Sequence, residues 1–369
     1  MNDTRTSPDT SPSVFHPAIQ RAVQRHREFY AGERDFLLQI HLPVPLDDLE
    51  PCPPVEAVDW EHGYDEYVRV NVENGKKYAS RRLDVDIDDD LIPGYHPRFG
   101  ISIHSSFFGG AVHFGGDTSY VEPVISRAAD WAQLAPDVNN FWLQRLTRGM
   151  AYTRDHGDGV LIATFRGANG PLDMANGVLG NTFFDELYDD PKNMHRVVDV
   201  CWQATLLTFN LQRQYCTEIA GGHVAPGGYW LPSEAIGHLS VDASCLISPA
   251  MFDEFEKPYL EQIAARTAGM FVHVHMLGRH AFRNLAQTKG VLVISPADDP
   301  NQPALLDELD NVLDAVGDIP LTVGIRRDRF AEDLPKFTGR RAIFSTFAAN
   351  RDEALAIMEE VDRYCPLKR

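Results

Sequence analysis

Short runs of apolar and β-branched residues alternate with longer amphipathic segments over most of this chain. The runs that predict strands are residues 100–105, 159–165, 270–276, 291–294, 321–325 and 342–347. Segments with a helical spacing of apolar residues lie between them, as at residues 191–215 and 251–267. Strands that alternate with helices are typical of parallel βαβ units, and nearly all-apolar strands fit a sheet that helices cover. The pattern therefore predicts an α/β fold.

The N-terminal part of the chain follows a different pattern. Apolar and aromatic positions predict a helix over residues 14–30, a strand over residues 36–42 and a further helix over residues 64–72. The polar, Ser/Thr/Pro-rich residues 1–12 predict a disordered tail and lack the apolar stretch of a signal peptide. We expect residues 13–95 to form an extension that packs on the main domain.

The number of strand–helix units decides between two architectures. About eight units close a (β/α)8 barrel, whereas about five or six form an open doubly wound sheet. Nucleotide-binding sheets of the open kind carry a glycine fingerprint, and the sequence contains neither G-x-G-x-x-G nor a P-loop. The 369 residues suffice for one barrel of roughly 250 residues with an extension. We therefore predict a (β/α)8 TIM barrel over residues 96–369.

Charge excludes several classes of partner. The chain carries 53 acidic and 34 basic side chains, a formal net charge of −19. Nucleic acids and anionic membrane surfaces both bind to basic faces, so we expect neither as a partner. Acidic residues concentrate at residues 84–90, DVDIDDD, where a cation could bind but a solvated loop is the favoured interpretation.

The cysteines indicate a reducing compartment. They are few and widely spaced, without a Cys-x-x-Cys pair: Cys52, Cys201, Cys216, Cys245 and Cys365. Such an odd, scattered set favours neither a disulfide framework nor a zinc ribbon, and the cytoplasm is the natural setting. The sequence also has no run of about 18 apolar residues that would predict a membrane-spanning helix.

Two histidines on a predicted strand are the main candidates for metal binding. His273 and His275 lie two apart in the run FVHVHM, so both side chains share one face of the strand. Zinc takes neutral imidazole ligands, and we expect His280, after a glycine turn, as a third ligand. His223 or His238 could also join them. The alternative is a hydrogen-bonded pair without metal, which could still act in acid–base catalysis.

Three further polar residues follow or close predicted strands, where barrel active sites lie. We expect Asp242 to be catalytic together with His275, with the capping of backbone amides as the alternative role of Asp242. Arg166 could hold a substrate carboxylate as a catalytic residue, or form a structural ion pair. Asp173 either binds substrate or caps the following helix.

A glycine-rich stretch at residues 221–230, GGHVAPGGYW, is typical of a ligand-binding loop. Glycine lets the backbone approach a ligand, and Tyr229 and Trp230 could form a stacking wall. We expect these two residues, with His223 and His238, to contact a small-molecule substrate. The alternative is a flexible connector whose aromatic side chains fold into the core.

Several motifs follow the pattern of one enzyme family in their order and spacing. Residues 239–259, LSVDASCLISPAMFDEFEKPY, combine a strand-end Asp with an Ile-Ser-Pro-x-x-Phe helix start and a later Pro-Tyr. Ser248 suits the N-cap of that helix, and Pro249 suits its first position. The other matching segments are FRGANGPLD at residues 165–173, GNTFFDELY at residues 180–188 with Asp190-Pro191, and PRFG at residues 97–100 with SSFFG at residues 105–109.

From roughly residue 95 to its end, the chain resembles the uroporphyrinogen decarboxylase superfamily, which implies a TIM barrel. One branch of that superfamily decarboxylates uroporphyrinogen without a metal, using an Asp and an Arg-Gln-Ala-Gly-Arg motif that this sequence lacks. The other branch transfers methyl groups between corrinoid proteins and acceptors, with zinc held by His-x-Cys and a distant Cys. His275-Met276-Leu277-Gly278 is similar to His-x-Cys-Gly, with Leu277 in place of the thiolate ligand.

The resemblance implies an enzyme of the corrinoid-linked methyltransferase type that acts on a small molecule, with zinc and a corrinoid carried by a partner protein. Asp242, His275 and His273 would hold or activate the acceptor. The first alternative is a cofactor-free decarboxylase or lyase, in which Arg166 binds a carboxylate and Asp242 stabilises developing positive charge. The second is a catalytically inactive ligand-binding relative. A homodimer is left open.

Overall fold

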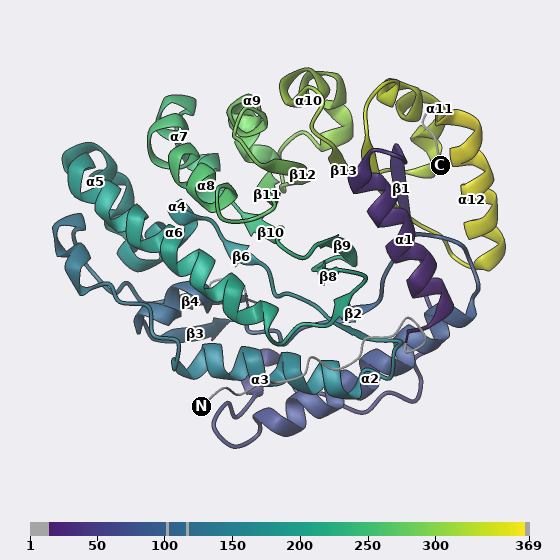
Figure 1. The fold of residues 1–369 in the computed structure, drawn as a ribbon, viewed down its shortest axis with the longest axis horizontal. Coiled ribbons are helices and arrows are strands. Elements are labelled where there is room, and N and C mark those ends of the chain that lie inside the picture. The colour runs from purple at the N-terminus through teal and green to yellow at the C-terminus, as the bar shows by residue number, and fades with distance from the viewer. Residues whose placement is uncertain (1–14, 101–102, 116–117, 366–369) are drawn as a thin grey trace.

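Helices surround the strands of a parallel sheet in the computed structural model of the chain (Figure 1). The structure describes residues 15–100, 103–115 and 118–365, so the predicted tail at residues 1–12 lies outside the described residues. Over these ranges, no helix is both long and apolar enough to cross a membrane. The prediction of an α/β fold is confirmed.

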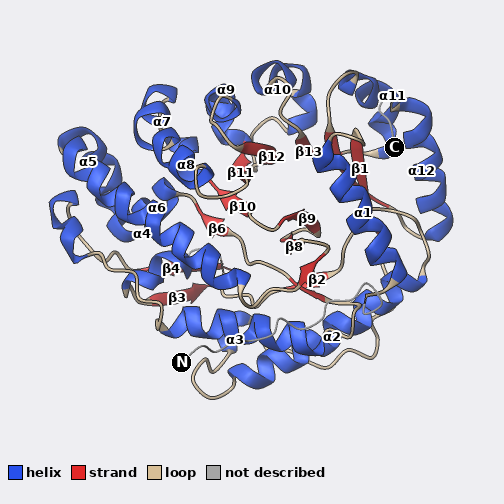
Figure 2. Cartoon of the chain, viewed as in Figure 1, coloured by secondary structure: helices blue, strands red, loops and turns tan. Residues whose placement is uncertain are grey.

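The central sheet has seven strands, and every neighbouring pair is parallel. Their hydrogen-bonded order is β1 (Phe36–His41), β14 (Ala342–Phe347), β13 (Leu321–Gly324), β12 (Val291–Ala297), β11 (Met270–His275), β10 (Ile236–Ser240) and β6 (Ala168–Asn169). The strand predicted over residues 342–347 has the bounds of β14. Buried apolar side chains dominate the sheet because helices pack on its outer side (Figure 2).

The described residues form twelve α-helices. They are α1 (Pro17–Ala31), α2 (Tyr64–Asp84), α3 (Phe141–His156), α4 (Pro171–Leu179), α5 (Phe183–Asp189), α6 (Pro191–Arg213), α7 (Pro249–Phe255), α8 (Lys257–Ala264), α9 (Phe282–Ala286), α10 (Leu309–Val316), α11 (Phe330–Asp333) and α12 (Arg351–Tyr364). The predicted start of α7 is confirmed, since the Ser248 side chain accepts a hydrogen bond from the Met251 N–H at 3.3 Å and Pro249 is the first helical residue.

Two predictions of local structure are wrong. The helix expected over residues 251–267 is split into α7 and α8 at Glu256, because Pro258 has no backbone N–H and its ring disfavours a continuous helix. Residues 103–105 of the strand expected over residues 100–105 belong instead to the 3-10 helix η3 (Ile103–Phe108), and residues 101–102 lie outside the described residues. After η3, the Gly109 N–H donates to the Ser106 carbonyl at 2.8 Å and closes a turn.

The region expected as an N-terminal extension contributes a strand to the central sheet. β1, which begins at Phe36, pairs with β14 along its whole length, from Phe36 opposite Ala342 to His41 opposite Phe347. Its run FLLQIH is apolar enough to be buried on both faces, as in a parallel sheet that helices cover. The N-terminal region therefore supplies part of the central sheet.

The acidic run at residues 84–90 is only partly solvated, contrary to the favoured interpretation. Asp89 accepts a hydrogen bond from the Ile40 N–H at 2.9 Å and pairs with Arg82 at 2.7 Å, where both side chains are 4% exposed. Asp90 accepts from the Leu38 N–H at 2.6 Å, and its own N–H donates to the Leu38 carbonyl at 2.8 Å. These carboxylates thus line the free side of β1.

Three smaller sheets complete the strand content of the described residues. β2 (Gly94–Tyr95) pairs in parallel with β5 (Ile162–Ala163). β3 (Val112–Gly115) and β4 (Thr118–Val121) are antiparallel. The third sheet is antiparallel and has the order β7 (Glu218–Ile219), β8 (Gly222–Ala225) and β9 (Tyr229–Pro232). The predicted binding loop is therefore a β8–β9 hairpin.

One face of the central sheet changes from apolar to polar along its strands. Near the strand starts, Leu37, Phe271, Val293 and Ile343 pack with residues of β8 and β9. Side chains alternate along a strand, so the residues two positions later lie on the same face. These are Gln39, His273, Ser295 and Ser345. The polar part of this face lies toward the carboxyl ends of the strands.

Candidate metal centre

Polar side chains gather where β10 and β11 end, two strands that lie side by side in Figure 1. Ser240 is opposite His273 in the register of these strands, and β11 ends at His275. After β10 the chain enters the 3-10 helix η6 (Asp242–Leu246), which begins with Asp242. Carboxyl ends of parallel strands meet at one edge, and Asp242, His273 and His275 come together there.

The spacing of these three side chains suits a metal ion. One donor atom of each residue lies within 4.8 Å of the other two. Asp242 Oδ1 is 3.9 Å from His273 Nε2, and Asp242 Oδ2 is 3.8 Å from His275 Nε2. Both distances exceed hydrogen-bonding range, whereas donor atoms around a tetrahedral zinc ion are roughly 3.4 Å apart. A small inward movement would bring all three into coordination range.

The chemical state of the donors also fits a metal. Asp242 Oδ1 is buried, and no described residue hydrogen-bonds to it, which is rare for a buried carboxylate oxygen. Burial, together with the neighbouring His275, lowers the pKa of His273 to about 4, so its ring is neutral near pH 7 and keeps a lone pair. Two imidazole nitrogens and one carboxylate form a donor set that binds zinc and leaves a coordination position open.

Asp299 orients His275. Its Oδ1 lies 2.7 Å from His275 Nδ1, and its Oδ2 accepts a hydrogen bond from the Leu277 N–H at 2.7 Å. Burial opposes ionisation of Asp299, but these two bonds outweigh it and lower its pKa. A carboxylate that accepts from Nδ1–H leaves Nε2 as the free donor atom, the arrangement common behind metal-binding histidines.

Asp173, in the first turn of α4, hydrogen-bonds to the backbone at the start of η6. It accepts hydrogen bonds from the Asp242 N–H at 3.1 Å, the Ala243 N–H at 2.6 Å and the Ser240 hydroxyl. Burial and the nearby charge of Asp242 raise the pKa of Asp173, while these bonds oppose the rise. Burial also raises the pKa of Asp242, against the influence of His275. Asp173 is therefore placed to position Asp242 rather than to contact substrate directly.

His238 packs against the metal-binding group. Its ring stacks on that of His273 with centroids 4.6 Å apart. The residue has φ 48°, and the register of β10 against β11 shifts between Ile236 and Leu239. A bulge with a left-handed residue costs conformational energy and redirects a side chain, a feature that recurs beside active sites. Here it turns the His238 ring toward His273.

Arg166 lies between β5 and β6, on the far side of β10 from His273. Its guanidinium donates to the Gly100 carbonyl and lies 3.4 Å from His104 Nδ1, and burial lowers its pKa to about 10. His104 Nδ1 also contacts the side-chain oxygen of Asn169. The structural ion pair considered for Arg166 is not formed with any described residue.

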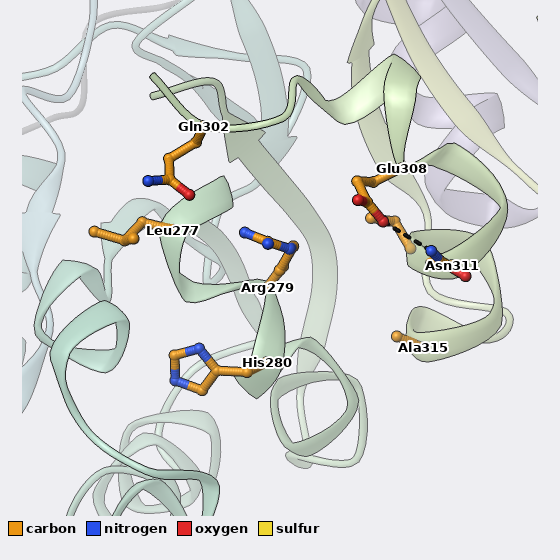
Figure 3. A pocket seen from close by; sticks show the side chains of 8 residues that line it. Leu277, Arg279, His280, Gln302, Glu308, Asn311 and Ala315 are labelled. Carbon is orange, nitrogen blue, oxygen red and sulfur yellow. Dashed lines mark hydrogen bonds between the residues drawn. The ribbon is translucent and has the colours of Figure 1, made fainter. Parts of the chain in front are cut away.

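His280 is not part of the donor group. Its Nε2 hydrogen-bonds with the Ile247 carbonyl at 2.8 Å. Figure 3 shows it on the 3-10 helix η7 (Met276–Ala281), where it lines a pocket of ≈ 510 Å³ shared with residues of α10. Among the described residues, the ligand that joins His273 and His275 is Asp242.

The aromatic residues of the β8–β9 hairpin belong to the core. Trp230 is 4% exposed, and its Nε1 donates to the Ile219 carbonyl at 2.8 Å. His223 is 2% exposed and packs against Phe165, with ring centroids 4.2 Å apart. Neither is placed to contact a substrate at the metal centre, because side chains cover both. Tyr229 stacks on Phe271 at 5.0 Å, on the sheet face that leads to His273.

Three residues near the site were not anticipated from sequence. Asp299 follows β12 by two positions, so the rule that selected Asp242 after a strand could also have found it. His104 and Asn169 come together from η3 and β6. No spacing in the sequence indicates that pairing, because 65 positions separate the two residues.

No protein-family model matches the sequence, and no curated protein shows significant similarity to it. Function is therefore inferred from the geometry at the strand ends and from the motifs of the sequence.

Proposed function

We propose that the strands close into a (β/α)8 barrel with an active site at its carboxyl end. The outermost strands of the seven-stranded sheet are β1 and β6, and backbone hydrogen bonds link the region around β2 to β1 and to β5. The Asp90 N–H donates to the Leu38 carbonyl of β1 at 2.8 Å, and the Ile162 N–H of β5 donates to the Pro93 carbonyl at 3.0 Å. β2 pairs with β5, which leads directly into β6. These contacts support a ring in which β2 and the joined β5–β6 segment bridge β10 and β1.

On this fold we propose a metal-dependent enzyme that transfers a methyl group to or from a small molecule. The observation that carries the proposal is the group formed by Asp242, His273 and His275. Zinc fits two neutral imidazole nitrogens and a carboxylate oxygen, and when bound it lowers the pKa of a thiol or water ligand. A nucleophile made available at neutral pH is what a methyl acceptor needs.

The residues around the donor group keep it in place during the reaction. Asp299 fixes the ring of His275, and Asp173 fixes the backbone that carries Asp242. In the transfer step, the acceptor atom forms a bond to the methyl carbon while the bond from methyl to its donor breaks, leaving the electron pair on the donor. The motif resemblance supports a corrinoid carried by a partner protein as that donor.

A second candidate is a cofactor-free decarboxylase or other lyase. The observation that favours it is Arg166, which has no acidic partner among the described residues. Its guanidinium would hold a substrate carboxylate, and Asp242 would stabilise positive charge that develops on the substrate. This reaction would not depend on His275 as a metal ligand.

Metal content separates these candidates. Protein purified without chelator is expected to hold about one equivalent of zinc by mass spectrometry, and the His273→Ala/His275→Ala variant is expected to hold none. His280→Ala is the matched control and should keep the metal, because His280 hydrogen-bonds to the Ile247 carbonyl outside the donor group. Wild-type protein without metal, even after incubation with zinc, would contradict the proposal and favour the lyase.

Activity separates a working enzyme from an inactive relative. The wild-type protein and the double variant would be incubated with methylated corrinoid and thiol, amine or phenol acceptors, and the products followed by mass spectrometry. We expect methylated product only with wild-type protein. Zinc binding and ligand binding without product would identify an inactive ligand-binding relative.

A further inference from the structure

Arg166 is a cation that no described residue neutralises. Its guanidinium is bonded to the Gly100 carbonyl and to His104 Nδ1, both uncharged acceptors. Within residues 15–100, 103–115 and 118–365, no carboxylate forms an ion pair with it. Burial lowers the pKa of Arg166 to about 10, so the group is still charged at neutral pH.

A charge removed from water and left unpaired is strongly disfavoured. The uncompensated charge lies beside His104, which contacts Asn169 at the carboxyl end of β6, and ligands bind at the carboxyl ends of such strands. Both facts indicate that the partner of Arg166 is a ligand.

The histidines around Arg166 add no positive charge to its own. Burial and the charge of Arg166 lower the pKa values of His96 and His104 to about 3. Because these rings are neutral at pH 7, the region matches a monoanion such as a carboxylate better than a phosphate dianion.

His104 offers a further contact for the same ligand. The residue is 2% exposed, and its Nε2 has no hydrogen-bond partner among the described residues. Its Nδ1 is engaged by the Asn169 side chain and by Arg166. When Nδ1 accepts from the Arg166 N–H, the proton of the neutral ring lies on Nε2, which can then donate to an oxygen of the ligand.

The distance from this region to the metal centre follows from the strand register. Asn169 is opposite Ser240, and Ser240 is opposite His273. The three residues therefore lie side by side on the adjacent strands β6, β10 and β11, which Figure 1 shows in that order. Neighbouring strands are about 4.8 Å apart, which puts Asn169 and His273 about 10 Å from each other. A small molecule can span that distance.

We propose that Arg166, assisted by His104, binds the carboxylate of a small monoanionic substrate whose other end reaches Asp242, His273 and His275. The substrate class deepens the proposed function and rests on it for the reacting end of the molecule. Binding of the carboxylate itself does not require the metal, so the two proposals can fail separately.

The test measures binding of benzoate and its uncharged analogue benzamide to chelator-treated protein by calorimetry. Wild-type protein is expected to bind benzoate at least roughly tenfold more tightly than benzamide or inorganic phosphate. Arg166→Gln should weaken benzoate binding at least roughly tenfold and leave benzamide binding unchanged. Arg213→Gln is the matched control, because Arg213 pairs with Glu234 at 2.6 Å outside the site.

Arg166→Lys guards against a variant that does not fold, since it keeps the charge and should retain part of the preference for benzoate. Equal binding of benzoate and benzamide, no binding of benzoate, or an unchanged affinity in folded Arg166→Gln would each overturn the carboxylate site. Tighter binding of phosphate than of benzoate would overturn its monoanionic character. Zinc content, measured on the same preparations before chelation, reports on the metal centre independently.

Discussion

His275 and Asp299 are joined by a hydrogen bond of 2.7 Å between Nδ1 and Oδ1, and this bond directs the other ring nitrogen toward Asp242. His275 ends β11, and Asp299 follows the neighbouring parallel strand β12 by two positions. An imidazole held in one tautomer and one orientation loses less freedom when it binds an ion. The bond therefore links the strand register to metal affinity.

Asp299→Asn is expected to weaken zinc binding by about 10- to 100-fold, because an amide holds the imidazole less firmly and makes it a weaker ligand. The measurement is a competition titration against a chromophoric chelator. Asp298→Asn is the matched control, since Asp298 accepts from the Leu305 N–H at 2.7 Å and does not contact His275. Equal losses in both variants would show that general charge, rather than orientation, governs affinity.

Asp173→Ala is expected to lower the free energy of unfolding by about 2–4 kcal/mol. It leaves the Asp242 N–H, the Ala243 N–H and the Ser240 hydroxyl without their acceptor. Zinc affinity should fall as well, because the backbone of Asp242 is no longer anchored. Urea unfolding and metal titration check both effects. A variant with wild-type metal affinity would contradict the positioning role.

Arg82→Ala is expected to destabilise the fold by about 3–5 kcal/mol, since it leaves the Asp89 carboxylate buried without a cation. Urea unfolding of the neighbouring Arg81→Ala variant gives the control. Arg81 pairs with the exposed Asp48 at the surface, and its loss should cost much less stability than the loss of Arg82. Similar losses of unfolding free energy in the two variants would contradict a special contribution of the buried Arg82–Asp89 pair to stability.

His223→Leu is expected to reduce the sensitivity of the protein to acid. Burial, together with the charge of Arg213, lowers the pKa of His223 to about 3, below the ordinary value of 6.5. Below pH 6.5 His223 is protonated in the unfolded chain but stays neutral in the folded protein. The free energy of unfolding therefore falls as pH falls toward 3. The slope is at most about 1.4 kcal/mol per pH unit for one such group.

Urea unfolding at pH 7.5 and pH 5.5 measures this effect. Wild-type protein should lose about 1.4 kcal/mol more than the variant between the two conditions. An equal loss in both proteins would show that His223 does not carry this part of the pH dependence.

Local patterns in the sequence determined much of the secondary structure. The apolar runs of β11 and β14 and the Ser248-Pro249 start of α7 were recognisable because they depend on residues close together in the chain. The His-x-His spacing likewise placed His273 and His275 on one face, since side chains alternate along any strand. Asp242 was identified by its position after a strand.

Tertiary structure decided which of these residues meet. The third candidate ligand beside His273 and His275 is Asp242 rather than the expected His280. The start of η6 brings Asp242 close to the two histidines, whereas His280 hydrogen-bonds to the Ile247 carbonyl. Asp89 became a buried partner of Arg82 although it stands in a run of acidic residues. β1 joined the central sheet although its partner, β14, lies about 300 positions later. Contacts over such separations depend on how strands pack and register, and spacing along the chain does not encode them locally.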